Sequence, residues 1–315
     1  MLAKLFDDIG IASFIHSTVL TLAFTLLVYF VSGPSSVSIG LIHYTWSLPG
    51  YWAAILATPL ILFSSLWFNF IINSIPLFKR DYQLCFVLAI LLIPVLITQG
   101  SLDLILLLPL IVLFLSRQLA LGENPAIAYL LFDSGTLIGL MLFFEPLSWV
   151  FLLVLWLGLV NYGHFGLKQI LIPVLGLLAI WFVVCSVLYW TAGISEVVSA
   201  LGALVNLPQA NLPVWSENLW RISPLVILLI PSFLELLGAY GKVKVLQSKS
   251  FGFLMIMFIA ILVAGAVFYN PAGLWIWMAF PTAVLVVNLI NALKRRWLKE
   301  LAYLLLLSYL LLFLI

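Results

Sequence analysis

The chain has 315 residues, of which 65% are hydrophobic and only 8% are charged, and its mean hydropathy is +1.28. A soluble domain carries about 25% charged residues because its surface has to be hydrated. The composition therefore excludes a water-soluble globule of this size, and the net charge of +2 does not suggest nucleic acid as a partner. We expect an all-α bundle that lies in the lipid bilayer as a single integral membrane domain over residues 1–315.

Apolar runs of about 20 residues, long enough to cross a hydrocarbon core of about 30 Å, recur along the whole chain. They predict about eleven spans. These lie near 13–32, 52–75, 84–98, 102–117, 126–144, 147–162, 167–191, 222–241, 250–269, 273–293 and 301–315. The third and fourth runs are short and closely spaced. They could instead form a re-entrant pair, which would leave about nine spans.

The positions of the basic residues predict the orientation. With a cytoplasmic N-terminus, twelve of the thirteen Lys and Arg residues fall on the cytoplasmic side, and only Arg221 falls outside. Short cytoplasmic loops are enriched in Lys and Arg, so this pattern favours a multi-pass protein of the bacterial inner membrane. Several tryptophans, among them Trp190 and Trp277, fall at predicted outer ends, where amphipathic rings prefer the headgroup level.

Two outer loops are long. The first, at 33–51, is uncharged and contains His43. The second, at 192–221, begins with apolar residues spaced so that they share one helical face, which predicts an interfacial helix at about 194–206. Trp215 and Trp220 follow it and are expected to anchor the return of the chain to the membrane.

Asp133 is the most conspicuous polar residue inside a predicted span. A charged Asp at the middle of a membrane helix costs about 2.5–3.5 kcal/mol on the insertion scale, so its environment has to compensate. One hypothesis is a ligand-binding or proton-handling site. The alternative is a neutral Asp that joins two helices by hydrogen bonds. Gly135 and Gly139 form a G-x-x-x-G pair on the same helix, which is typical of close helix packing.

Two acidic residues, Asp103 and Glu145, fall in adjacent outer turns. Oxygen ligands of this kind suit Mg²⁺ or Mn²⁺, so the pair could hold a divalent metal or a sugar hydroxyl. The alternative is a pair of solvated loop acids. Since no spacing signature of a metal or cofactor site is present, we expect no metal and no cofactor unless the protein is a transferase that uses this pair.

Residues 66–193 resemble an uncharacterised family of bacterial polytopic inner-membrane proteins, domain-of-unknown-function family 6427. The resemblance is carried by the outer turn with Pro146 and by two stretches, Leu131-Phe-Asp-Ser-Gly-Thr-Leu-Ile-Gly-Leu140 and Asn161-Tyr-Gly-His-Phe-Gly-Leu-Lys-Gln-Ile-Leu-Ile-Pro-Val-Leu-Gly176. It implies a multi-pass topology and no particular chemistry.

The helix order is also similar to that of GT-C glycosyltransferases, which use polyprenyl-phosphate-linked sugars. In that likeness Asp103 takes the place of a metal ligand or base, but the first outer loop lacks the acid that the mechanism needs. We therefore expect a non-catalytic or divergent GT-C-like protein.

Three hypotheses follow. The leading one is a protein that binds a lipid-linked ligand or a membrane-protein partner in cell-envelope biogenesis, with Asp133, Glu145, His43, Trp215 and Trp220 as candidate binding residues. The alternatives are a glycosyltransferase with Asp103 as its catalytic residue and an ion- or proton-coupled transporter that uses Asp133.

Overall fold

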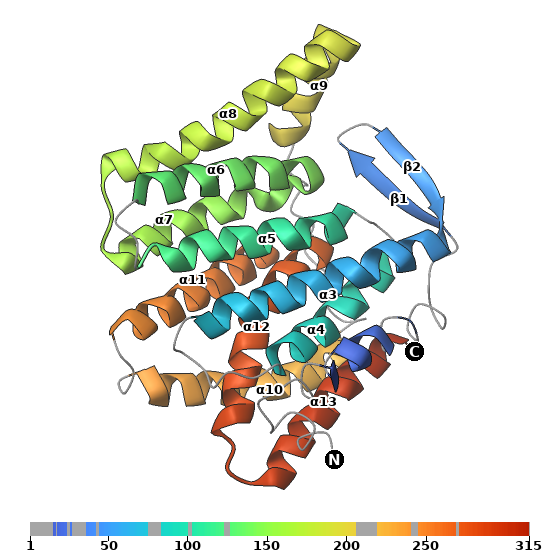
Figure 1. Ribbon diagram of the computed structural model, residues 1–315, viewed down its shortest axis with the longest axis vertical. Coiled ribbons are helices and arrows are strands. Elements are labelled where there is room, and N and C mark those ends of the chain that lie inside the picture. The colour runs from blue at the N-terminus through green and yellow to red at the C-terminus, as the bar shows by residue number, and fades with distance from the viewer. Residues whose placement is uncertain are drawn as a thin grey trace.

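The computed structural model describes residues 15–16, 18–23, 26, 36–41, 44–74, 83–99, 103–122, 127–205, 219–240, 245–268 and 271–314. Over these residues the protein is a bundle of long helices with one small β-hairpin (Figure 1). The predicted first span, at 13–32, falls largely outside the described residues.

The described helices follow the apolar runs of the sequence closely. In chain order they are α3 (Gly50–Ser74), α4 (Gln83–Gln99), α5 (Asp103–Ala120), α6 (Ile127–Phe144), η1 (Pro146–Trp149), α7 (Val150–Tyr162), α8 (Leu167–Ala192), α9 (Ile194–Val205), α10 (Leu219–Tyr240), α11 (Val245–Phe268), α12 (Pro271–Ala292) and α13 (Arg296–Leu314). Apolar runs of this length form helices because a membrane segment has to satisfy its own backbone hydrogen bonds.

Six of the described helices are long and apolar enough to cross a membrane: α3, α6, α8, α10, α11 and α12. Shorter apolar helical segments lie at Gln83–Ile93, Leu104–Ala120 and Pro146–Tyr162. The coarse prediction of a helical bundle with membrane-spanning potential is therefore confirmed.

The closely spaced runs at 84–98 and 102–117 form two separate helices. Both pack against α3 and α12, but α4 also packs against α13, whereas α5 also packs against α6. The two helices thus occupy different places in the bundle instead of pairing with each other.

The described part of the predicted first outer loop contains structure that the sequence did not predict. Strands β1 (Ser36–Leu41) and β2 (Tyr44–Pro49) pair antiparallel, with Ser36 opposite Pro49 and Leu41 opposite Tyr44. The all-α prediction therefore holds outside this hairpin. The alternation of small polar and apolar residues at Ser36-Val-Ser-Ile39 has the period of a strand.

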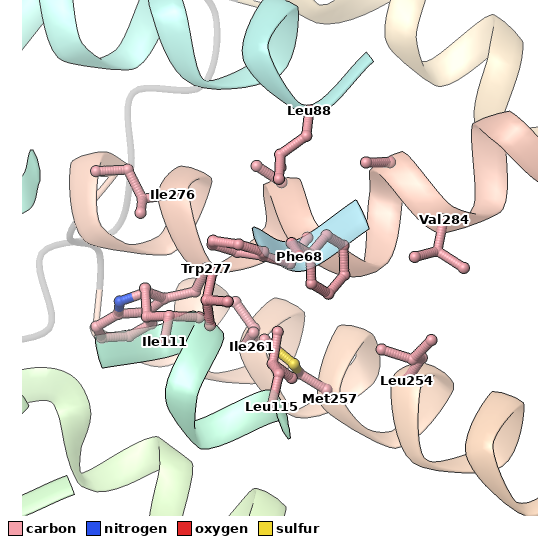
Figure 2. Close-up of a cluster of buried hydrophobic side chains, with 14 of the residues drawn as sticks. Phe68, Leu88, Ile111, Leu115, Leu254, Met257, Ile261, Ile276, Trp277 and Val284 are labelled. Atoms are coloured by element: carbon pink, nitrogen blue, oxygen red, sulfur yellow. The ribbon is translucent and has the colours of Figure 1, made fainter. Parts of the chain in front are cut away.

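The hydrophobic core is centred on α12, which lies among α4, α10 and α11. Figure 2 shows Trp277 and Val284 of α12 packed with Phe68 of α3 and Met257 of α11. The indole of Trp277 is fully buried and meets the ring of Phe151 edge-on, with 5.2 Å between the centroids. The Trp277 indole therefore contacts protein and not lipid, because α12 is surrounded by other helices.

Helices α6 and α8 form the most extensive helix–helix contact. A Cβ atom at Gly135 would collide with the backbone of Pro173, and one at Gly139 would collide with the side chain of Ile180. On the other side, a Cβ atom at Gly176 would collide with the carbonyl of Phe132. The G-x-x-x-G pair is therefore confirmed as a packing motif within the chain.

Candidate functional site

Polar side-chain contacts gather at one end of the helical bundle. Figure 1 shows that the C-terminal ends of α5 and α7 and the N-terminal ends of α6, α8 and α11 lie together, at the left of the view. Arg117, Lys168 and Lys249 lie on these helix ends, and we call this region the basic end. The start of α5, the α6–η1 turn, helix α9 and the hairpin lie toward the opposite end.

An ion pair joins α5 to α6 at the basic end. The Nε atom of Arg117 lies 3.3 Å from Oδ2 of Asp133, and these side chains are 35% and 26% exposed. The guanidinium carbon also lies 5.5 Å from the centre of the Tyr129 ring, which is a cation–π distance. Arg117 thus compensates the charge of Asp133, and the pair links the two helices.

A second, uncharged link lies next to the first on both helices. The amide nitrogen of Gln118 donates a hydrogen bond to the hydroxyl of Ser134 over 2.8 Å, and that hydroxyl donates to the carbonyl of Leu130 over 2.8 Å. Gln118 and Ser134 are fully buried. Helices α5 and α6 are therefore joined by two successive polar pairs, one charged and half-buried, the other neutral and buried.

A reciprocal pair of hydrogen bonds joins α7 to α11. The side-chain amide of Asn161 donates to the carbonyl of Lys249 over 2.6 Å, and the Lys249 ammonium donates to the carbonyl of Tyr162 over 3.0 Å. The ammonium caps a helix C-terminus, where carbonyl groups lack partners and the helix dipole favours a cation. Gly163 ends α7 with a positive φ of 78°, a conformation that glycine adopts without strain.

The two acids that were predicted to lie in outer turns occupy different structural positions. Asp103 is the first residue of α5, and the structure describes its backbone only. Glu145 is 8% exposed and precedes η1, where its carboxylate accepts a hydrogen bond of 3.4 Å from the backbone N–H of Leu147. The Glu145 side chain thus acts as a buried helix cap, which differs from the expected solvated loop acid.

The remaining predicted site residues lie wholly or partly outside the part of the chain that the structure describes. His43 and Trp215 fall outside the described residues, and for Trp220, near the start of α10, only the backbone is described. Within the described ranges, no group of three or more His, Cys, Asp and Glu residues is placed to hold a metal ion. The site that the structure does describe is therefore the basic end, and its contacts hold helices together.

The sequence profile of a family of unknown function, DUF6427, matches residues 53–315. The chain belongs to this family. The DUF6427 match covers residues on both sides of the 66–193 stretch that carries the sequence resemblance. No curated protein matches the chain.

The pairing at the basic end was not predicted, although a signal for part of it was present. Arg117 and Gln118 close one apolar run, and Asp133 and Ser134 lie in the first two turns of the next. Two antiparallel neighbouring helices place residues near a shared turn at similar depth, so a comparison of depths would have matched Arg117 with Asp133. The link between Asn161 and Lys249 spans 88 residues, and no local pattern indicates it.

Proposed function

We propose that this DUF6427 protein is a multi-pass protein of the bacterial inner membrane that binds a lipid-linked ligand or a membrane-protein partner at its outer face. In this proposal the N-terminus is cytoplasmic, the role is in cell-envelope biogenesis, and the protein is non-catalytic. The basic end then faces the cytoplasm.

One observation carries the proposal: α8 and α9 present a large apolar surface outside the bundle. Only 22% of an 18-residue apolar stretch of α8 is buried. Trp190, near the end of α8, is 86% exposed, and Ile194 and Val198 of α9 are also exposed. A surface of this kind requires an apolar environment, because monomeric soluble proteins rarely leave such large apolar patches in water.

The position of α9 supports binding at the outer face. Helix α9 begins directly after Gly193, whose φ of 90° ends α8 and redirects the chain. Its apolar residues share one side, and Glu196 lies in its first turn. A short amphipathic helix at the end of a span suits the boundary between headgroups and acyl chains, where a lipid-linked ligand has its polar part.

The Arg117–Asp133 pair supports a structural role for Asp133 over transport. A transport site needs an acid that can exchange its partner for an ion or a proton. Asp133 instead has a cationic partner within 3.3 Å, next to a second pair that joins the same helices. We therefore assign Asp133 to the assembly of α5 and α6.

The orientation is tested by labelling single cysteines from outside intact cells with a membrane-impermeant reagent. Cysteines at Ser195 and at Lys294 are compared, in a background without Cys85 and Cys185. We expect labelling at Ser195 only. Labelling at Lys294 would reverse the orientation and place the basic end outside.

Ligand binding is tested by native mass spectrometry of the protein purified in mild detergent. We expect a co-purifying lipid-linked species that is reduced at least several-fold by Val198→Asn, which makes the exposed apolar side of α9 polar. The matched control is Ser195→Asn on the polar side of the same helix. If the two variants retain equal amounts of the lipid-linked species, or if the unchanged protein carries none, α9 is not the binding element.

A further inference from the structure

Three polar residues lie together on the buried side of α3. Ser64 and Ser65 are fully buried, and Asn69, one turn further along, is 2% exposed. Phe68 lies on the same side of the helix and meets the ring of Phe280 of α12 edge-on, at 5.1 Å between the centroids. The polar residues therefore face the interior of the bundle, whereas Phe63 and Phe70 on the opposite side of α3 are exposed.

The three residues lie at the centre of the apolar part of their helix. The span-length segment of α3 runs from Leu56 to Ser74, and Ser65 is equally far from its two ends. At 1.5 Å per residue, each end is about 14 Å away. This is the region of a membrane protein in which an unsatisfied polar group is least tolerated, because water and headgroups are most distant.

The hydroxyl groups of Ser64 and Ser65 and the side-chain oxygen of Asn69 are buried and have no hydrogen-bond partner among the described residues. Two other buried serines, one in α6 and one in α10, do not behave in this way. The hydroxyls of Ser134 and Ser232 donate to the carbonyl four residues earlier on their own helix. This local bond is the usual solution for a serine inside an apolar helix.

The clustering of these atoms distinguishes α3 from the rest of the described bundle. Buried polar atoms without a partner also occur at Gln118, Ser148, Trp181 and Trp277, but each lies on a separate turn or helix. On α3, three such oxygens fall within six residues on one side of a helix. One orphaned oxygen can be an accident of packing, but three adjacent ones indicate a shared partner.

We propose that Ser64, Ser65 and Asn69 form one wall of a buried polar binding site at the middle of α3, which holds a small neutral guest that donates hydrogen bonds. The Asn69 oxygen can only accept a hydrogen bond, and a serine hydroxyl can both donate and accept. The guest therefore has to supply at least one O–H or N–H group. Water and the hydroxyl group of a bound small molecule share this chemistry.

A charged guest fits these residues less well. Ser64, Ser65 and Asn69 carry no charge, and none of the described residues of α3 is acidic or basic. A bare ion at the middle of an apolar helix needs a compensating charge, which this side of α3 does not provide. The inference concerns the interior of the bundle, and it holds whether or not the outer face binds a ligand.

The decisive experiment measures whether replacing one of these serines by alanine lowers or raises the stability of the protein. Removing a hydroxyl that binds a guest loses a hydrogen bond, whereas removing a truly orphaned hydroxyl relieves a desolvation penalty. We expect Ser65→Ala to lower the thermal unfolding midpoint of the purified full-length protein by about 2 °C or more. An increase, or no change, would overturn the proposal.

Ser232→Ala is the matched control. Ser232 is as deeply buried as Ser65, and its hydroxyl bonds only to the carbonyl of Leu228 on its own helix, at 2.6 Å. The same hydroxyl oxygen is removed in both variants, so the general effect of replacing a buried serine by alanine is subtracted. A decrease in Ser65→Ala that is no larger than that in Ser232→Ala would count against the site.

A second measurement identifies the guest. In X-ray hydroxyl-radical footprinting, radicals formed from bound water oxidise adjacent side chains even when bulk solvent cannot reach them. If water is the guest, Phe68 is oxidised faster than the equally buried Phe253 of α11, and Ser65→Ala removes the difference. If a small molecule is the guest, native mass spectrometry shows an added mass that Ser65→Ala removes. If neither of these two signals is observed, the proposal is refuted.

Discussion

Helices α8 and α12 are both long enough and apolar enough to cross a membrane, yet they occupy opposite environments. In α12, 72% of an 18-residue apolar stretch is buried by other helices, whereas in α8 the share is 22%. Figure 1 shows α12 among other helices and α8 at the edge of the bundle. The apolar composition of a helix thus indicates that it is kept out of water. It does not indicate whether lipid or protein surrounds the helix.

The way each helix is packed explains the difference. Helix α8 buries only a narrow stripe, Pro173, Gly176, Leu177 and Trp181, and this stripe meets α6. Its first half packs backbone to backbone through small residues, which is how membrane helices approach closely. Helix α12 buries large side chains on several sides, including Trp277 and Phe280. Helix α8 is therefore held by the close approach of its backbone to that of α6, and α12 is held by the packing of large buried side chains.

The largest effect on stability is expected when a large buried side chain of α12 is truncated. Trp277→Ala deletes a fully buried indole that packs against Phe151 at 5.2 Å. We expect a loss of about 3–5 kcal/mol in the free energy of unfolding, since the surrounding helices can only partly fill the cavity. The measurement is reversible denaturation of the purified protein in detergent micelles.

The control for this change is Trp190→Ala on α8, where the indole is 86% exposed. It is expected to alter the unfolding free energy by less than about 0.5 kcal/mol. If the two substitutions cost the same, burial within the bundle does not distinguish α12 from α8.

Adding volume to the α6–α8 contact has the next largest expected effect. In Gly135→Ala, the new methyl group collides with the backbone of Pro173, so the two helices have to separate. Overpacking of this kind costs about 1–3 kcal/mol. Gly202→Ala on α9 is the control, because a Cβ atom there meets nothing within 4 Å. If the two alanines were equally tolerated in a thermal unfolding assay, the close approach of α6 and α8 would be disproved.

The smallest effect is expected from the half-buried ion pair. A double-mutant cycle with Arg117→Ala and Asp133→Ala measures the interaction between the two side chains separately from their individual roles. Since both groups are about one third exposed or less, we expect a coupling free energy of about 1 kcal/mol. The corresponding cycle between Arg117 and Glu235 of α10 serves as the comparison. A coupling free energy near zero in the first cycle would show that the Arg117–Asp133 ion pair does not stabilise the contact between α5 and α6.

The helices and the packing motif of α6 could be predicted because their signals are local. Apolar runs are bounded by turns with charged or small residues, and the predicted helix at 194–206 corresponds to α9 within one residue. The spacing of Gly135 and Gly139 likewise indicates one helix face. These features depend on neighbours along the chain, so the sequence alone reveals them.

The neighbours of each helix could not be predicted in the same way. The burial of Trp277 depends on three helices that surround α12, and the partner of Asp133 depends on how α5 lies against α6. The hairpin in the first outer loop needs a pairing of two short segments with weak patterns. The sequence placed most candidate binding residues in or near the two long loops predicted on the outer face, whereas the polar contacts described above lie at the basic end.

The reciprocal bonds between Asn161 and Lys249 have a consequence for biosynthesis. The two residues are 88 positions apart, so α7 cannot acquire this partner until α11 has been translated. At about 5–20 residues per second, the nascent chain waits about 4–18 s between the two events. During this interval α8, α9 and α10 have to leave the ribosome while the place beside α7 that α11 later takes is still accessible.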